Sequence, residues 1–219
     1  MAREDSYLIH RQRMVNEQIR RRGISDERVL SVMTRVPREC FVPAGDAAAA
    51  FSDQALSIGH GQTISQPTTV MIMTSALDVR EGQKILEVGA GSGYQAAILG
   101  LLTGEHGRVI TTEIISGLVS FAQQNLKKEG IRNVEVVCSD GGAGYEKNAP
   151  YDRIMVTAAC PKIPKPLIKQ LKEGGILVAP VECQTGQILV RGIKKDGKLE
   201  TQSLGYFRFV PLTGKYGYC

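Results

Sequence analysis

The sequence has 219 residues, of which 42% are hydrophobic and 22% are charged. These proportions are typical of globular domains and exclude a largely disordered or fibrous protein, and the length suits one domain with a small appendage. Lysine and arginine (27) outnumber aspartate and glutamate (22), which gives a net charge of +5, but the excess is spread along the chain and there is no tryptophan. Charge alone therefore does not predict nucleic-acid binding.

The sequence predicts neither membrane insertion nor secretion. No apolar stretch approaches the roughly 18 to 20 residues of a membrane-spanning helix, and the charged residues 1–5 lead into no apolar signal segment. The five cysteines form no CxxC pair and have no metal-ligand spacing from the three histidines. We therefore expect a cytoplasmic protein with reduced thiols, no metal and no membrane partner.

Short helices are predicted for the first fifty residues. Apolar residues among the arginines of 11–22 indicate an amphipathic helix that ends at Gly23. Ser25 can cap a second helix, whose apolar side chains are spaced for one buried face and which Pro37 stops. The alanine run 47–50 also favours a helix.

The next segment, 58–67, is rich in glycine and small polar residues, so we expect an irregular functional loop. From residue 68 onward, helical and strand patterns alternate. Helices are predicted at 68–77, 94–102, 115–129 and 164–172, and strands at 84–88, 108–112, 134–138, 151–158, 175–180, 188–194 and 201–210. This order predicts an α/β fold: a Rossmann-like, doubly wound, mainly parallel seven-stranded sheet with an N-terminal helical extension. The turn signal at 195–197 predicts that the C-terminal strand pair is antiparallel.

A glycine loop follows the first predicted strand and opens a helix, which is the context of a nucleotide-binding site. Glycines allow a tight turn and let a ligand approach the main chain closely. Gly89, Gly91 and Gly93 have the spacing GxGxG, whereas a dinucleotide fingerprint, GxGxxG, would need glycine where the chain has Tyr94. The loop therefore indicates a cofactor other than a dinucleotide.

Acidic residues end three successive predicted strands. Glu87 stands two residues before the first glycine, where a carboxylate would repel a pyrophosphate but suits the ammonium end of a cationic ligand. Glu113, twenty residues after Gly93, stands where a carboxylate accepts hydrogen bonds from ribose hydroxyls. Asp140 can accept from the exocyclic amine of adenine, although Glu113 or Asp140 alone would more often be a helix cap or a surface carboxylate. Together these acids and the glycine loop indicate S-adenosylmethionine as cofactor.

The methyl acceptor is less directly indicated by the residues. Asn148–Tyr151 looks like the Asn-Pro-Pro-Tyr element of amino-methylating nucleic-acid enzymes, but it precedes the fourth strand instead of following it. The place after that strand holds the small, nearly neutral segment 157–160. Cys160 lacks a preceding proline, and buried thiols are usually inert. These features disfavour nucleobase methylation and a cysteine nucleophile.

Several motifs together resemble the protein-L-isoaspartate O-methyltransferase family over almost the whole chain. They are Met14-Val15-x-x-Gln18-Ile19, Arg22-Gly23-Ile24-Ser25-Asp26, Val36-Pro37-Arg38-Glu39-x-Phe41-Val42-Pro43, Gly61-Gln62-Thr63-Ile64-Ser65-Gln66-Pro67, the loop Leu86–Tyr94, and Phe209-Val210-Pro211-Leu212. The segment Gly61–Pro67 is the most specific, because ordinary methyltransferases of this fold lack it.

The resemblance implies a class I methyltransferase fold and methylation, from S-adenosyl-L-methionine, of the free α-carboxylate of L-isoaspartyl residues in damaged proteins and peptides. This reaction starts repair through a succinimide. Ser65 matches the family's active-site serine. The cofactor-binding residues expected from the acidic pattern and the resemblance are Ile64, Glu87, Gly89, Gly91, Gly93, Glu113, Asp140 and Gly141. The substrate-binding residues that it implies are His60, Gln62, Thr63, Val210, Pro211 and Leu212.

The implied chemistry needs no general base, because a carboxylate with a pKa near about 4 is already ionised at neutral pH and can attack the sulfonium methyl in line. A hydroxyl such as that of Ser65 can hold one carboxylate oxygen and leave the other to attack. Ser65 also suits the N-terminal cap of the helix expected near Pro67.

Two other functions stay open on the residues alone: a small-molecule or RNA methyltransferase with the same cofactor domain, and a binding module that has lost turnover. We expect a monomer in which residues 1–64 form a helical cap and active-site loop. Residues 65–219 would form the cofactor-binding α/β domain, and the two parts would make one compact unit. The expected partners are isoaspartyl proteins and peptides, with no nucleic acid.

Overall fold

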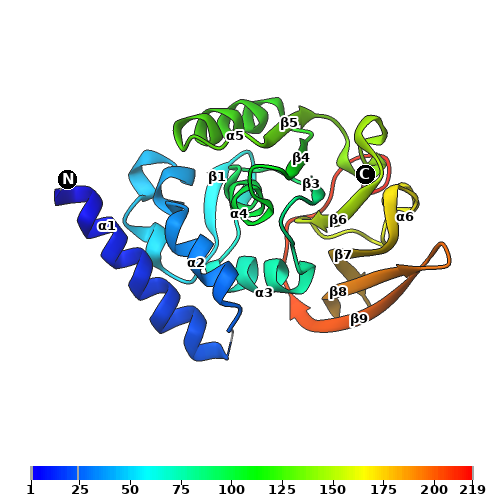
Figure 1. The fold of residues 1–219 in the computed structure, drawn as a ribbon, viewed down its shortest axis with the longest axis horizontal. Helices are drawn as coiled ribbons and strands as arrows, with labels where there is room; N and C mark the ends of the chain where they lie inside the picture. Colours follow the sequence, from blue (N-terminus) through cyan, green and yellow to red (C-terminus); the bar gives the residue numbers. More distant parts are fainter. Residues whose placement is uncertain (1, 24, 219) are drawn as a thin grey trace.

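A computed structural model of the chain describes residues 2–23 and 25–218; Ile24 and Cys219, which the sequence patterns include, lie outside this range. The centre is a seven-stranded sheet with the strand order β5-β4-β3-β6-β7-β8-β9 (Figure 1). The strands are β3 (Lys84–Val88), β4 (Arg108–Glu113), β5 (Val134–Cys138), β6 (Tyr151–Val156), β7 (Leu171–Cys183), β8 (Gly186–Lys195) and β9 (Lys198–Phe207). Helices α3 (Pro67–Leu77), α4 (Tyr94–Thr103), α5 (Ser116–Lys128) and α6 (Lys165–Gln170) connect or flank them. The predicted Rossmann-like, seven-stranded fold is confirmed.

The parallel part of the sheet brings the carboxyl ends of successive strands to one edge. Strands β3, β4, β5 and β6 pair in parallel, with Glu87 opposite Thr111 and Glu113 opposite Cys138. Most side chains of β3, β4 and β6 are buried, as expected for strands that are covered on both faces, whereas those of the edge strand β5 are only partly buried. The loops that follow these strands therefore share one crevice.

The other end of the sheet is antiparallel. The turn between β8 and β9 has positive φ at Asp196 (50°) and Gly197 (73°), so the predicted hairpin is confirmed. Strands β7 and β8 are also antiparallel, because the two residues between them are too few for the crossover that parallel pairing requires.

The N-terminal region is helical, as predicted, but its boundaries differ. Helix α1 (Ala2–Arg13) continues through a π-helical segment, Met14–Ile19, and ends at Gly23, whose φ is 79°. Helix α2 (Glu27–Arg35) is capped by Asp26, whose carboxylate accepts from the amides of the first turn. The expectation that Ser25 caps this helix is therefore wrong by one residue.

The alanine run does not form an α-helix. Short 3₁₀ turns occupy Ala44–Asp46 and Ala49–Phe51. A run of four alanines is too short to offset the cost of helix nucleation. In addition, the carbonyl oxygen of Ala50 accepts from the Arg38 guanidinium at 2.6 Å instead of from a helical amide.

The expected irregular loop is largely a β-hairpin. Strands β1 (Leu56–Gly59) and β2 (Gln62–Ile64) pair antiparallel around a turn with positive φ at His60 (54°) and Gly61 (70°). Such φ values suit the right-handed twist of a hairpin. Ile58 and Ile64 are buried, so the apolar side chains on one face of the hairpin hold it on the body of the molecule.

The N-terminal region packs on α4 and α5. One apolar cluster contains Met14, Ile19, Leu30 and Phe41 together with Tyr94 and other residues of the two helices. Figure 1 shows α1 and α2 at one end of the molecule and the β8–β9 hairpin at the other. Among residues 2–23 and 25–218, no helix has the length and apolar character needed to span a membrane.

Candidate active site

The glycine loop adopts a conformation that other residues rarely allow. The φ angles of Gly89, Gly91 and Gly93 are 100°, 53° and 86°. A Cβ at Gly89 would lie only 2.4 Å from Thr157 Oγ1, and that hydroxyl donates to the Gly89 carbonyl oxygen at 2.8 Å. On the other side, the amide of Gly89 donates to the Thr112 carbonyl oxygen at 2.9 Å. Hydrogen bonds on both sides therefore fix the loop between β4 and the end of β6.

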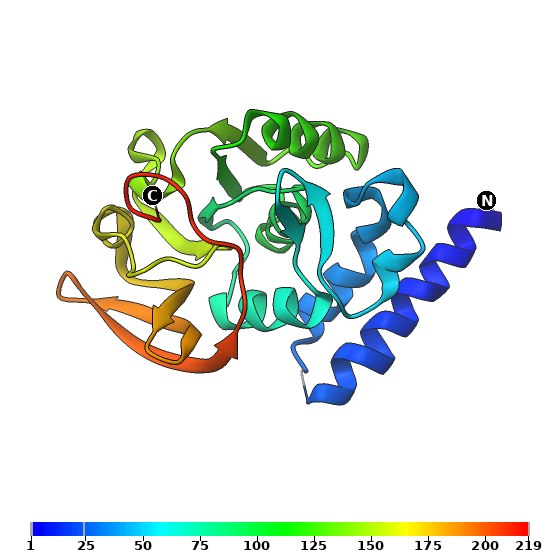
Figure 2. The ribbon, with the colours of Figure 1, turned by 180° about the vertical axis from the view of Figure 1, so that it is seen from behind.

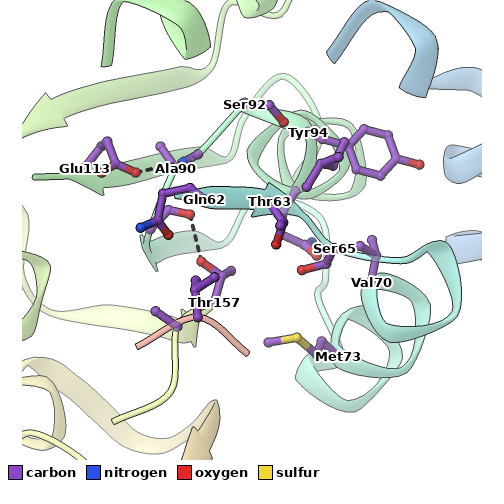
Figure 3. Close-up of a pocket in the computed structure, with 16 residues that line it drawn as sticks. Gln62, Thr63, Ser65, Val70, Met73, Ala90, Ser92, Tyr94, Glu113 and Thr157 are labelled. Atoms are coloured by element: carbon purple, nitrogen blue, oxygen red, sulfur yellow. Dashed lines mark hydrogen bonds between the residues drawn. The ribbon is translucent and has the colours of Figure 1, made fainter. Parts of the chain in front are cut away.

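A hollow, whose empty space of about 610 Å³ includes the open solvent at its mouth, lies between this loop and the β1–β2 hairpin (Figure 3). The hairpin, α3, the glycine loop and the segment after β6 contribute most of its lining, which is Gln62, Thr63, Ile64, Ser65, Val70, Met73, Gly89, Ala90, Gly91, Ser92, Tyr94, Gln95, Glu113, Thr157, Ala158 and Val210.

A second hollow of about 400 Å³ adjoins the first, because Gln62, Gly89, Glu113 and Ala158 line both. It extends past the ends of β4 and β5 to Ser139, Gly141, Pro211, Leu212 and Thr213. Among the described residues that line the two hollows there is no lysine, arginine or histidine. This lining disfavours phosphate groups and fits a cationic ligand.

Glu113 is the acidic residue that both hollows share. One carboxylate oxygen accepts from the Gly91 amide at 2.9 Å, and the other accepts from the amides of Ile114 and Ile115. These bonds fix the carboxylate at the end of β4. A carboxylate has about four acceptor sites, so one is left, on the oxygen that accepts from Gly91. Glu113 could therefore accept a hydrogen bond from a hydroxyl of a ligand in the hollows that it lines.

Glu87 lies beneath the glycine loop and lines neither hollow. Its side chain is fully buried, and neither carboxylate oxygen has a hydrogen-bond partner among the described residues. The pKa of Glu87 is raised from 4.5 to about 8: burial is the main cause, the nearby Thr111 hydroxyl offsets part of the rise, and the Glu113 carboxylate adds a smaller rise. A buried acid in this state fits a positively charged ligand bound above it, whose field would favour the ionised form.

The Asp140 carboxylate makes hydrogen bonds to backbone amides of its own chain. Its carboxylate accepts from the amide of Gly142 at 2.9 Å and from that of Lys215 at 2.7 Å, so it caps the turn after β5 and holds the C-terminal segment. That segment runs from the end of β9 back across the molecule (Figure 2). Gly141, next to Asp140, lines the second hollow, whereas Asp140 does not.

Ser65 lies at the joint between β2 and α3 and lines the first hollow opposite Thr157 (Figure 3). Ser65 does not cap α3. The capping hydrogen bonds come from Asp53, whose carboxylate accepts from the Thr68 amide at 2.8 Å and from the Thr68 hydroxyl at 2.7 Å. The alternative reading of Ser65 as a helix cap is therefore wrong. Gln62, Thr63 and Ile64 precede it in the same wall of the hollow.

The remaining predicted substrate residues lie at the edges of the site. His60 is exposed at the hairpin tip and lies outside the hollow; an ideal Cβ at Gly117 would lie 2.8 Å from its Nε2. Val210 and Leu212 already pair with Ala159: the Val210 oxygen accepts from its amide at 2.8 Å, and the Leu212 amide donates to its oxygen at 2.7 Å.

Sequence reasoning missed several residues of this site. Val70 and Met73 line the hollow from α3, and their helical spacing signalled only a buried face. Thr157 follows β6 directly, and its hydrogen bond to the glycine loop joins segments that are far apart in the sequence. No local pattern marked Arg38 or Asp53 as neighbours of Ser65.

Comparisons with known proteins show the family of this chain. The family model described as Protein-L-isoaspartate(D-aspartate) O-methyltransferase matches residues 9–217. The chain is 49% identical over 208 residues to a protein-L-isoaspartate O-methyltransferase of Methanoculleus marisnigri, covering 95% of this chain and 93% of that protein. It is 47% identical over 214 residues to that of Geobacter metallireducens, covering 97% and 98%.

Solved structures extend the likeness to the whole fold. A protein-L-isoaspartate O-methyltransferase superposes with a TM-score of 0.85 at 29% identity, covering 94% of this chain and 67% of that one. A Plasmodium falciparum structure, named as a putative member of the same group and containing S-adenosyl-L-homocysteine, gives 0.81 at 26% identity, covering 93% and 98%. The chain therefore belongs to the protein-L-isoaspartate(D-aspartate) O-methyltransferase family.

Proposed function

We propose that this protein transfers the methyl group of S-adenosyl-L-methionine to the free α-carboxylate of L-isoaspartyl residues in damaged proteins and peptides. The transfer is a direct in-line displacement without a general base, and the methyl ester starts repair through a succinimide. The placement of Ser65 in the same hollow as the glycine loop and Glu113 carries this proposal.

The cofactor side is formed by the glycine loop and the acids below and beside it. Glu113 would hold the ribose hydroxyls, Gly89 and Gly91 would admit the ligand close to the main chain, and Glu87 would balance its positive charge. Gly141 and Ser139 line the second hollow, which would accommodate the adenine. Bound there, S-adenosyl-L-methionine supplies an electrophilic methyl group on a sulfonium.

The acceptor side is formed by uncharged groups. The Ser65 hydroxyl would donate to one oxygen of the substrate carboxylate and leave the other oxygen exposed for reaction. Val70, Met73 and Val210 are apolar and would exclude water from the same space. A carboxylate with a pKa near about 4 needs no proton removed, so orientation is the main contribution required, and it can lower the barrier by up to about 7 to 11 kcal/mol.

A matched pair of peptides tests the substrate. One carries an isoaspartyl residue and the other carries aspartate at the same position, and both are incubated with methyl-labelled cofactor. We expect label on the isoaspartyl peptide only, and we expect mild alkali to release it because it is an ester. Equal labelling of both peptides, or label that survives alkali, would contradict the proposal.

The division of roles between the two sides predicts separate effects of two substitutions. Ser65→Ala should lower kcat about 10- to 100-fold, the value of one hydrogen bond to a charged group, and leave cofactor affinity nearly unchanged. Glu113→Ala should first weaken cofactor binding, by a similar factor. Steady-state kinetics and calorimetry with S-adenosyl-L-homocysteine measure the two effects.

Ser75→Ala is the matched control, because Ser75 lies on α3 but contacts Met71 instead of the hollow. It should change neither kcat nor affinity by more than about twofold. A loss of cofactor affinity alone in both Ser65→Ala and Glu113→Ala would show that the roles are wrongly divided.

A further inference from the structure

One buried guanidinium connects the N-terminal region to the serine of the hollow. Arg38 lies in the 3₁₀ turn Arg38–Phe41 and is 0% exposed. Its Nη1 donates to the Ala50 carbonyl oxygen at 2.6 Å, and its Nη2 donates to the carbonyl oxygens of Gln54 and Ser65 at 3.0 Å each. A single side chain thus joins both ends of the segment that carries the β1–β2 hairpin.

The charge of Arg38 is retained at this position. Burial lowers the pKa of Arg38, but Tyr94 and the Asp53 carboxylate raise it, and an arginine remains protonated at any physiological pH. The guanidinium carbon lies 6.0 Å from the centre of the Tyr94 ring, a distance suited to a cation–π contact. Hydrogen bonds from a charged donor are stronger than neutral ones, so the Ser65 carbonyl is held firmly.

Ser65 lies between two anchors. Arg38 holds its carbonyl oxygen, and Asp53 holds the amide and hydroxyl of Thr68 at the start of α3. With the main chain fixed on both sides, the Ser65 hydroxyl can keep one direction into the hollow. A serine in a freely moving joint would lose part of that orientation, and an error of about 1 Å can cost about 100-fold in rate.

We propose that Arg38 is a positioning residue for Ser65: through the Ser65 carbonyl oxygen it sets the direction of the hydroxyl that receives the substrate carboxylate. This inference rests on the proposed function for its effect on turnover, but the tie between the two residues can be tested without any activity.

A double-substitution cycle tests the effect on turnover. Lysine keeps the charge of Arg38 but has one nitrogen, which cannot reproduce the planar fork that reaches three carbonyl oxygens. Arg38→Lys should lower kcat about 10- to 100-fold with cofactor affinity within about twofold. In a Ser65→Ala background the same change should lower kcat less than about twofold, because the oriented group is already absent. An equal loss in both backgrounds would overturn the proposal.

Arg153→Lys is the matched control for lost stability. Arg153 is half-buried, and its Nε donates to the carbonyl oxygens of Leu77 and Asp78 at the far end of α3. This substitution should lower the free energy of unfolding while kcat stays within about twofold. A loss of kcat equal to that of Arg38→Lys would mean that general loosening of α3, and not the orientation of Ser65, explains the effect.

Two measurements do not depend on turnover. Nuclear magnetic resonance of the unsubstituted protein should show separate, slowly exchanging Nη–H signals for Arg38, and averaged, fast-exchanging signals would contradict the bonds to Ser65 and its neighbours. In Arg38→Lys, amide exchange should quicken in residues 62–68 and stay unchanged in β3 and β4; unchanged exchange in 62–68 would overturn the tie. If the unsubstituted protein methylates neither peptide, the proposed function fails, while these measurements still decide whether Arg38 holds the Ser65 carbonyl.

Discussion

At the scale of single residues, the three acids that the sequence predicts to bind one cofactor occupy three different environments. Glu113 is fixed by amides and lines the hollows, and Asp140 holds the C-terminal segment. Glu87 is buried, with no hydrogen-bond partner in the part of the chain that the structure describes. The carboxyl ends of their strands meet at one edge of the sheet, as the sequence predicts. The backbone amides that donate to Glu113 and Asp140 set the directions of those two carboxylates.

Glu87 should give the cofactor-free protein an unusual pH dependence. Its pKa is raised in the folded state to about 8 from about 4.5, so between these values the folded protein holds a proton that the unfolded chain has lost. The stability that this proton contributes is fully present below about pH 4.5 and is lost as pH rises through about 8. The expected slope in the free energy of unfolding is at most about 1.4 kcal/mol per pH unit.

Urea unfolding of Glu87→Gln from pH 5 to pH 9 measures this effect. The substitution should remove the slope and become relatively more favourable as pH rises, because glutamine is never charged. Glu105→Gln, at an exposed position, should keep the slope of the unsubstituted protein. A slope that persists in Glu87→Gln would show that another group causes it.

At the scale of elements, the β1–β2 hairpin decides the shape of the site. It brings four consecutive residues, Gln62 to Ser65, against the glycine loop and rests its tip on the first turn of α5. The contact at the tip is close: the His60 ring lies where a side chain at Gly117 would begin. The absence of a side chain at Gly117 thus lets the hairpin close over the end of β4.

Gly117→Ala tests this contact. Alanine in a helix is normally more stable than glycine by roughly 0.4 to 1 kcal/mol. Here the gain should be smaller, because a Cβ at 2.8 Å from His60 Nε2 forces that side chain to shift. The full gain should return in a His60→Ala background, with a coupling energy of at least about 0.5 kcal/mol from thermal unfolding of the four proteins. Equal gains in both backgrounds would mean that the tip does not rest on α5.

At the scale of the whole molecule, the N-terminal region shares its core with the sheet domain. Phe41 packs on Tyr94 with 5.6 Å between ring centres, and Met14 and Ile19 lie in the same apolar cluster as Ile98. We propose that residues 1–64 and 65–219 fold as one compact unit, because neither part can bury this cluster alone.

Cooperative unfolding tests this unity. Phe41→Ala should destabilise the whole chain by about 3 to 5 kcal/mol and shift one common transition in urea, whether it is followed by circular dichroism or by tyrosine fluorescence. Tyr206→Ala, at a position that is 70% exposed, should change stability by no more than about 0.5 kcal/mol. A separate early transition confined to the N-terminal region would contradict a single unit.

Much of this molecule could be predicted from the sequence, because much of it is governed by local or periodic signals. The alternation of strands and helices, the glycine loop and the turn at Asp196 and Gly197 depend on backbone preferences of nearby residues. The predicted helix boundaries were wrong where a neighbouring side chain could make the same capping hydrogen bond, as when Asp26 and not Ser25 caps α2. The prediction of an irregular loop at 58–67 was wrong because glycine and polar residues are typical of both loops and hairpin turns.

The sequence by itself determined the fold class, the glycine loop after β3 and the family, since each depends on residue types at fixed spacings. Only the tertiary structure decided which acid lines the hollows, that Asp53 caps α3 in place of Ser65, and that Arg38 reaches the serine carbonyl. These contacts join residues 15 and 27 positions apart, and Glu113 meets Gly91 across 22. Their partners are selected by packing and desolvation in the folded chain, which no spacing within a single segment encodes.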